Sequence, residues 1–253
     1  MTSQEVAGRV KQKDWRVLDA APGPDAGSAM LPLLDDPDPE VRELALHVLN
    51  VVGGPVARQG FLKALKDRGD TVRSAACRFL HVHATREDVP AILAEVTGSF
   101  DEYVREQMGL LVGKLGDANA IPTLERQLAA EPDAHARHGL SIALARLGER
   151  RARQAYLERL RADNPRQRAA ALEDLLYIGD RRLVLDVLPL LDDLREAVNV
   201  APSATRYFIR VCDVAVNVLD VLLQHPFSFK VERVRRYSAE ELAEAKAVAA
   251  RTR

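Results

Sequence analysis

Apolar residues recur along the chain at helical spacing, in segments that follow a small polar loop. Most of these segments open with Asp or Asn, continue with Val or Ala and then Arg, and carry apolar residues three and four positions apart. Apolar residues at this spacing form one face of an α-helix. The pattern occurs six times, around Arg42, Arg73, Arg105, Arg137, Arg168 and Arg210.

The start and the end of these segments recur in phase. The six arginines are 31, 32, 32, 31 and 42 residues apart. Asp or Asn supplies the oxygen that caps a helix start, and glycine tolerates the left-handed backbone that ends many helices. A glycine stands eleven residues after four of the arginines, at Gly53, Gly116, Gly148 and Gly179. Each unit is therefore predicted to contain a helix of about three to four turns.

A further apolar stretch lies between each helix end and the next polar loop, for example from Ile121 to Leu128. This stretch predicts a second helix in each unit. A helix pair this short cannot bury its apolar stripe alone, so neighbouring pairs must stack and share a core. The sequence therefore predicts an all-α fold, a right-handed α-solenoid of about six stacked helix pairs with helical caps.

Three regions are expected. Residues 1–24 form an N-terminal helical cap and linker, because Thr2 to Glu5 has the pattern of a capping box. Residues 25–224 form the solenoid, and residues 225–253 form a C-terminal cap with a final helix that begins at Ser238. The long last arginine interval predicts an insertion near 192–204, which either carries a function or varies without consequence.

The recurring Asp, Val-Arg, Ala and closing Gly resemble bacterial HEAT repeats, in particular the short subtype also found in phycobilisome lyases. The resemblance covers about residues 30–223. It implies that the Val-Arg helix of each pair lines the inner, concave face of the stack. The resemblance is specific for architecture, because the matched residues are those that build the stack.

The outward face of the Val-Arg helices is the predicted binding surface for a partner protein. Its positions lie two residues before the recurring arginine and one, five and eight residues after it. The candidate residues are Glu43, His47, Arg78, His81, Tyr103, Glu106, Leu110, His135, His138 and Ile142. Leu110 and Ile142 are expected to form an exposed apolar pair; alternatively, the assigned helix phase is off by one residue or the curvature of the stack buries them.

In the sixth unit the same positions are apolar, from Phe208 to Val218. They need a cover, and Phe227 and Phe229 of the C-terminal cap are expected to supply it. The recurring arginines are expected to be structural and to donate hydrogen bonds between successive units.

The charge composition bears on which partners are expected. Formal net charge is −1, so the whole protein has no electrostatic attraction to nucleic acid or anionic lipid. Residues Arg146–Arg168 contain eight arginines and three acids, which leaves a nucleic-acid-binding protein as an alternative. The only tryptophan, Trp15, precedes the repeats, so no stacking platform for bases is expected there.

The cysteines and the absence of long apolar runs indicate the compartment. Cys77 and Cys212 lie too far apart in sequence to indicate a disulfide framework. The first 13 residues include no apolar core of a signal peptide, and no segment approaches the length of a membrane span. We therefore expect a cytoplasmic protein without a membrane partner.

No pattern of catalytic residues stands out, so no enzyme and no cofactor are predicted. His135 and His138 have the spacing of two metal ligands, with Glu106 as a possible third, but no supporting residues accompany them and no metal is predicted. The lyase resemblance leaves a bilin-lyase-like enzyme as a further alternative, although no residue marks a bilin site. The prediction is a non-catalytic scaffold or adaptor that binds another protein, with self-association left open.

Overall fold

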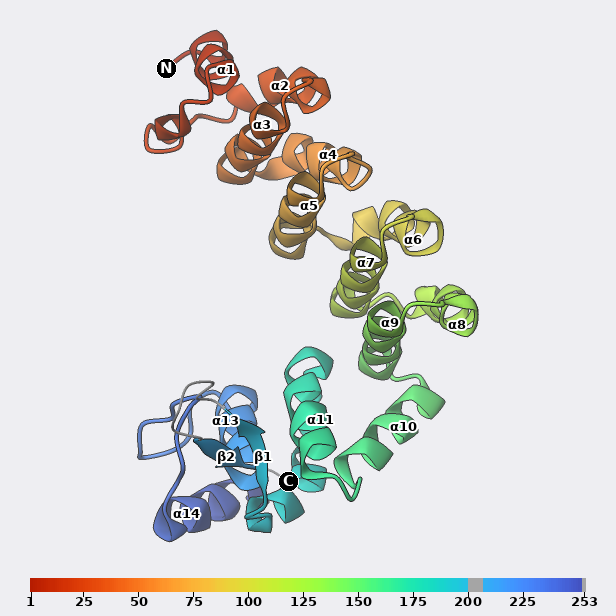
Figure 1. The fold of residues 1–253 in the computed structure, drawn as a ribbon, viewed down its shortest axis with the longest axis vertical. Coiled ribbons are helices and arrows are strands. Elements are labelled where there is room, and N and C mark those ends of the chain that lie inside the picture. Colours follow the sequence, from red (N-terminus) through yellow and green to blue (C-terminus); the bar gives the residue numbers. More distant parts are fainter. Residues whose placement is uncertain (200–206, 252–253) are drawn as a thin grey trace. The chain divides into compact units, whose positions relative to one another are not determined.

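The computed structural model describes residues 1–199 and 207–251. These residues form fourteen α-helices, a few short 3-10 turns and one pair of strands (Figure 1). The predicted all-α solenoid is therefore confirmed. The chain divides into two compact units, Met1–Ala143 and Leu144–Arg253. In the described residues, none of the helices has both the length and the apolar character of a membrane span.

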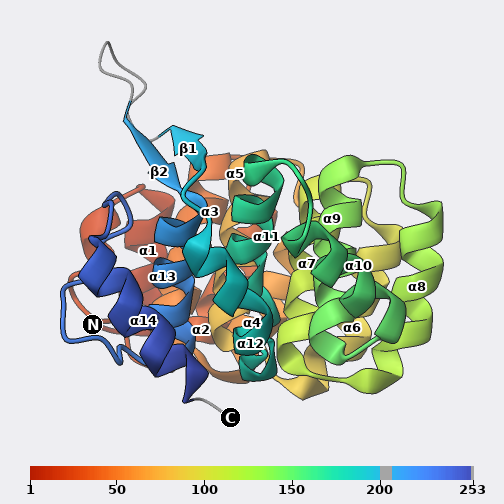
Figure 2. The same ribbon diagram turned by 90° about the horizontal axis from the view of Figure 1, so that it is seen from below.

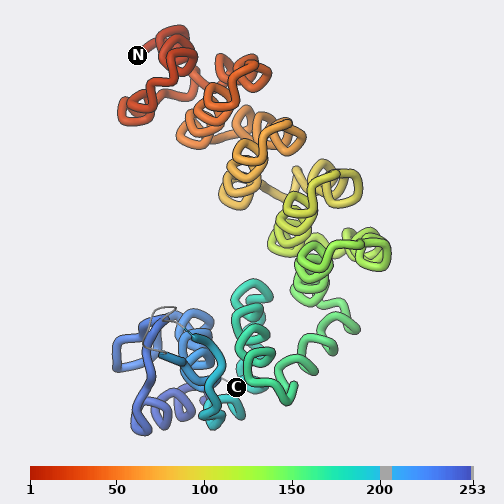
Figure 3. Tube along the Cα trace, in the orientation of Figure 1, coloured from red at the N-terminus to blue at the C-terminus, as the bar shows by residue number. Residues whose placement is uncertain are grey.

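Unit 1 begins with a cap and continues as two rows of helices (Figures 1 and 3). The cap comprises α1 (Ser3–Lys11) and a 3-10 turn, Trp15–Val17. One row contains α2 (Ala26–Met30), α4 (Gly54–Ala64), α6 (Val89–Gly98) and α8 (Ile121–Ala130). The other row contains α3 (Pro39–Val52), α5 (Asp70–His83), α7 (Glu102–Leu115) and α9 (Ala134–Leu147), within which the unit ends. Further 3-10 turns are Leu31–Asp35, Arg86–Asp88 and Ala118–Ala120.

The predicted caps account for most helix boundaries. Asp38 and Asp101 accept hydrogen bonds from first-turn amides of α3 and α7, as expected for N-caps. Gly116 ends α7 in the left-handed region, with φ of 74°. Asp70 differs from the prediction, because Gly69 is the N-cap of α5 and the Asp70 carboxylate instead accepts a hydrogen bond from Arg73.

Four of the six recurring arginines bond to a carboxylate of the next repeat, as predicted: Arg42, Arg73, Arg105 and Arg168. Arg137 instead donates to carbonyl oxygens of the loop before its own helix. Arg42 is buried and donates from Nε and Nη2 to the carboxylate of Asp67 at 2.7 and 2.8 Å. Its Nη1 donates to the carbonyl oxygen of Asp36, in the loop before its own helix, at 2.8 Å. Arg105 makes the corresponding bonds in the third unit. Each of these two arginines thus joins the loop that precedes its helix to a carboxylate of the next repeat.

Unit 2 continues with α10 (Arg150–Leu160), α11 (Pro165–Ile178), α12 (Val184–Val187), α13 (Val211–Leu222) and α14 (Ala239–Ala250). Further 3-10 turns are Arg181–Leu183 and Leu188–Asp192. Strands β1 (Glu196–Asn199) and β2 (Phe208–Arg210) pair antiparallel, as Figure 2 shows.

The sixth repeat departs from the prediction at its start. Phe208 to Arg210 was expected in a helix, yet these residues form β2, and α13 begins at Val211. Tertiary pairing with β1 replaces helix formation here, which apolar and β-branched residues such as Phe208 and Ile209 readily permit. The predicted insertion near 192–204 includes β1, and residues 200–204 lie outside the described residues.

The C-terminal segment covers α13. The buried carboxylate of Asp213 accepts hydrogen bonds from Arg210 and from the amide of Tyr237, the latter at 3.0 Å. Arg210 Nη2 also donates to the Tyr237 carbonyl oxygen at 2.7 Å. The Phe229 ring lies 5.5 Å from the Tyr237 ring. The last recurring arginine therefore holds the cap, whereas Arg42 and Arg105 hold a following repeat.

Candidate functional site

The outward sides of α3, α5 and α7 form a continuous row of polar and aromatic side chains in unit 1, which we call the ridge. It comprises Glu43, His47, Arg78, His81, Tyr103, Glu106 and Leu110. Arg78 and Tyr103 are exposed, and the other five are half-buried. The side of these three helices that the sequence predicts to face outward is therefore the side that is partly or fully exposed.

Trp15 joins the ridge, although sequence analysis placed it outside the repeats. Trp15 is 38% exposed, and its ring lies 5.2 Å from the His47 ring, edge to face. Its Nε1 donates to Glu40 at 3.2 Å, and the His47 ring lies 5.0 Å from that of Phe79. The only local signal is Asp14, whose carboxylate caps the turn that carries Trp15. The contact with α3 arises from the folding of the N-terminal cap.

Both imidazoles of the ridge are held in the neutral form near pH 7. Burial lowers the pKa of His47, with opposing effects from Glu43 and Arg78. Burial and the nearby ammonium group of Lys114 lower the pKa of His81. The His81 Nε2 lies 3.2 Å from the carbonyl oxygen of Gln107. These histidines therefore contribute ring surface and hydrogen bonds, and carry no positive charge.

Two charged residues of the ridge stand apart from the ion pairs of unit 1. Within the described part of the chain, Glu43 and Arg78 take part in no salt bridge, and Arg78 makes no hydrogen bond. The guanidinium group of Arg78 lies over the Phe79 ring, 5.9 Å from its centroid. Tyr103 is 38% exposed, and burial of the remainder raises its pKa. Exposed arginine and aromatic side chains are thus available together.

The predicted exposed pair of Leu110 and Ile142 is wrong at Ile142. It is only 3% exposed, so it offers no docking surface beside the half-buried Leu110. The reason is the close approach of α7 and α9, in which a Cβ at Gly113 would lie 2.8 Å from Ala143 Cα. Gly139 permits a similar approach to the side chain of Glu106. The alternative interpretation, in which the stack buries the position, is correct for Ile142.

His135 is exposed and His138 is half-buried on α9. In the part of the chain that the structure describes, no group of three or more His, Cys, Asp or Glu side chains is placed to bind a metal ion. Glu106 is therefore not brought to the two histidines as a third ligand.

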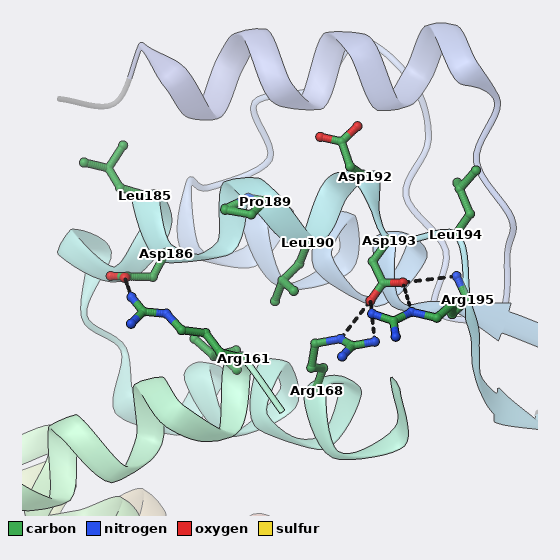
Figure 4. A pocket seen from close by; sticks show the side chains of 11 residues that line it. Arg161, Arg168, Leu185, Asp186, Pro189, Leu190, Asp192, Asp193, Leu194 and Arg195 are labelled. Atoms are coloured by element: carbon green, nitrogen blue, oxygen red, sulfur yellow. Dashed lines mark hydrogen bonds and ion pairs between the residues drawn. The ribbon is translucent and has the colours of Figure 1, made fainter. Parts of the chain in front are cut away.

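Unit 2 contains a pocket of about 870 Å³ between α10, α11 and the segment from Leu185 to Arg195 (Figure 4). Its charged residues are paired with each other. Asp193 accepts hydrogen bonds from Arg168 at 2.7 Å and from Arg195 at 2.9 Å. Arg161 donates to Asp186 at 3.3 Å. These charged side chains therefore neutralise one another within the pocket.

A pocket of about 590 Å³ occupies the corresponding repeat positions in unit 1. The matching pairs, unit 1 first, are Leu34 and Leu160, Arg42 and Arg168, Ala64 and Leu190, and Asp67 and Asp193. Because the buried arginine and its carboxylate build the stack in both units, such a groove follows from the repeat geometry. We therefore do not assign a ligand to either pocket.

Four of the eight arginines of the basic segment Arg146–Arg168 form ion pairs within unit 2. Arg153, Arg159 and Arg168 form ion pairs with Asp180, Asp174 and Asp193, each at 2.7 Å. Arg161 pairs with Asp186, and Arg146 donates to a carbonyl oxygen. Fewer arginines are free for phosphate contacts than the composition indicates, which weakens the nucleic-acid alternative.

Comparison with known proteins supports this architecture. The family model of HEAT repeats matches residues 9–81 and 89–176. The complex of CpcE and CpcF of phycocyanin lyase from Nostoc sp. PCC7120 contains a similar chain, 18% identical, with a TM-score of 0.53, covering 98% of this chain and 95% of that one. The Escherichia coli protein YibA is 16% identical with a TM-score of 0.51, covering 100% and 92%. No curated protein sequence matches the chain significantly.

Proposed function

The chain belongs to the HEAT-repeat family, and on this basis we propose that it is a non-catalytic adaptor that binds a partner protein on the ridge. The stacked helix pairs form a helical-repeat scaffold. The resemblance to short bacterial HEAT repeats implies that the Val-Arg helices line the concave face of such a stack. We therefore propose that the ridge is the part of that face used for binding.

The observation that carries this proposal is the grouping of Trp15, Arg78 and Tyr103 on one surface. Tryptophan, arginine and tyrosine are the residue types that dominate protein–protein binding energies. Each is exposed enough to contact a partner. Trp15 is also held in place by the His47 ring and the Glu40 carboxylate. Such side chains lose little conformational freedom on binding.

Two further points support protein binding. The similar phycocyanin lyase chain occurs in a complex of two proteins. The ridge also presents Glu43 and Glu106, which would repel a phosphate backbone. The free, buried thiols of Cys77 and Cys212 favour a reducing compartment such as the cytoplasm.

The test is capture of partners from nuclease-treated cell extract by tagged wild-type protein and two variants. The ridge variant is Arg78→Ala with Tyr103→Ala. The matched control is Glu125→Ala with Arg126→Ala, which removes exposed side chains from α8 in the same unit. Both variants should retain the wild-type circular dichroism spectrum, because exposed substitutions change stability by less than about 0.5 kcal/mol.

We expect at least one protein to be captured by the wild type and the control and lost by the ridge variant. Recovery of a second, differently tagged copy of this chain would identify that partner as the protein itself. If every captured protein is retained by the ridge variant, the proposal is wrong. Loss of all capture after nuclease treatment alone would favour the nucleic-acid alternative.

A further inference from the structure

The turn that joins α13 to the C-terminal cap has a strained backbone. Gln224 and His225 have positive φ angles of 64° and 59°, a region that residues other than glycine rarely adopt. His225 also precedes Pro226, and a residue before proline favours an extended backbone. We call this turn, residues 224–226, the hinge. Extending the hinge would relieve its strain.

Contacts with the end of α13 hold the hinge in its bent form. The amide of His225 donates to the carbonyl oxygen of Asp220 at 2.8 Å, and His225 Nδ1 lies 2.7 Å from Asp220 Oδ2. The amide of Gln224 donates to the carbonyl oxygen of Val221 at 3.3 Å. The His225 side chain is 79% exposed, so water competes for its contact with Asp220. The bent hinge is thus stabilised by a few local contacts and by the docking of the cap that follows it.

The cap is held together by contacts of its own. Ser228 donates from its amide and from its hydroxyl to the carboxylate of Glu244 on α14, both at 2.6 Å. The amide of Glu232 donates to the Tyr237 hydroxyl at 3.0 Å, and the Phe229 ring lies 5.5 Å from the Tyr237 ring. These contacts do not involve α13, so they are kept when the cap leaves that helix. The cap can therefore move as one body about the hinge.

The face of α13 beneath the cap requires a cover. Val214 and Val218 are buried there, and they line a cavity of about 180 Å³ together with Arg233 of the cap. Asn217 accepts a hydrogen bond from the Tyr237 hydroxyl at 2.7 Å and donates to the carbonyl oxygen of Arg233 at 3.3 Å. A cap that leaves this face uncovers apolar side chains and hydrogen-bonding groups. A second cap of identical sequence would satisfy them equally well.

We propose that two copies of this chain exchange their C-terminal caps. The hinge of each copy extends, and each cap docks on α13 of the other copy with the contacts that it makes here within one chain. The exchange keeps those contacts and relieves the positive φ angles of Gln224 and His225. Short hinges under strain favour such domain swapping, which forms a closed two-fold dimer. Because association costs translational freedom, the dimer forms at high protein concentration.

The first measurement is the dimer-to-monomer ratio of the full chain, by size-exclusion chromatography with light scattering after equilibration at several concentrations. His225→Pro cannot adopt the bent hinge, because proline fixes φ near −65°. Its ratio should exceed that of the wild type by at least about tenfold. Gln224→Gly with His225→Gly permits the positive φ angles without strain, so its ratio should fall by about tenfold.

The second measurement tests whether the cap of one copy docks on the other. Within one chain, Arg236 Nη2 of the cap lies 2.6 Å from Glu196 Oε1 of β1. A population carrying Glu196→Cys is mixed with one carrying Arg236→Cys, equilibrated, and treated with a short bismaleimide. We expect cross-linked pairs that contain one copy of each variant. The native thiols Cys77 and Cys212 are buried, and wild-type protein treated in the same way is the control for their reaction.

A wild-type chain that stays monomeric at every concentration would overturn the inference. So would a dimer that the hinge variants leave unchanged, or one that yields no mixed cross-link. The ridge variant, Arg78→Ala with Tyr103→Ala, should dimerise like the wild type, because the exchange uses only unit 2. Loss of the dimer in that variant would assign self-association to the ridge instead. Failure of the exchange leaves the proposed binding of a partner on the ridge unaffected.

Discussion

Replacing Glu131 by Gln tests how strongly the arginine bonds hold successive repeats together. Glu131 follows α8 and its side chain is fully buried. It accepts hydrogen bonds from Nε and Nη2 of Arg105 at 2.8 and 2.7 Å. It also accepts hydrogen bonds from Gln127 at 3.0 Å and from the amide of Asp133 at 3.1 Å. The substitution preserves the shape of the side chain and removes its charge.

The expected cost is about 3 kcal/mol of unfolding free energy. Hydrogen bonds to charged groups contribute about 1.5–3 kcal/mol each, and breaking a buried ion pair costs about 3–5 kcal/mol. The lower end of the second range applies, because the Arg105 side chain retains 12% exposure and its Nη1 still donates to Ser99. Glu125→Gln, on the exposed side of α8, should change stability by less than about 0.5 kcal/mol.

The destabilisation should depend on pH. The hydrogen bonds from Arg105 lower the pKa of Glu131 from 4.5 to about 2. A carboxyl whose pKa is lower in the folded state stabilises the protein above its unfolded pKa. The contribution of Glu131 is therefore fully present above about pH 4.5 and is lost as the pH falls towards 2. The difference between wild type and variant should decrease over the same range.

Urea unfolding followed by circular dichroism measures this effect. At pH 7, about 3 kcal/mol corresponds to a midpoint shift of about 1 M or more for typical urea dependences. A difference below about 0.5 kcal/mol at pH 7 would show that the arginine bonds contribute little to stability. A difference that is the same at pH 6 and pH 3 would show that the Glu131 charge is not its source.

Three further predictions concern other contacts. Gly113→Ala should lower the urea midpoint, at a cost of about 1–3 kcal/mol, because its Cβ would lie 2.8 Å from Ala143 Cα; Gly8→Ala, with open space around it, is the control, and equal midpoints would contradict the close approach. His47→Gln should reduce the loss of stability on acidification below about pH 6.5, because burial lowers the pKa of His47 and protonation then favours the unfolded state; parallel melting-temperature profiles of wild type and variant between pH 7.5 and 5.5 would refute it. Tyr237→Ala should cost about 3 kcal/mol and accelerate proteolysis of the C-terminal cap, because Tyr237 is only 3% exposed; an unchanged cleavage rate would show that Tyr237 does not hold the cap.

The local pattern of residues was sufficient to predict the repeats and their stacking. Helix periodicity, cap residues such as Asp38 and the glycine at 116 act over a few neighbouring positions, so they are visible in sequence. The recurring arginines were also predictable, because their phase with the loops places each guanidinium group beside the same backbone positions in successive units. The outward phase of α3, α5 and α7 follows from the same periodicity.

Tertiary packing decided which further residues join the ridge and which predicted residue leaves it. Trp15 enters it because the N-terminal cap folds against α3, a contact between residues far apart in sequence. Ile142 leaves it because small residues let α7 and α9 approach closely. Phe208 to Arg210 pair with β1, although their phase with the repeats indicated a helix. Local periodicity determines which side of a helix is apolar, whereas burial depends on interhelix distances and long-range contacts that only the folded chain establishes.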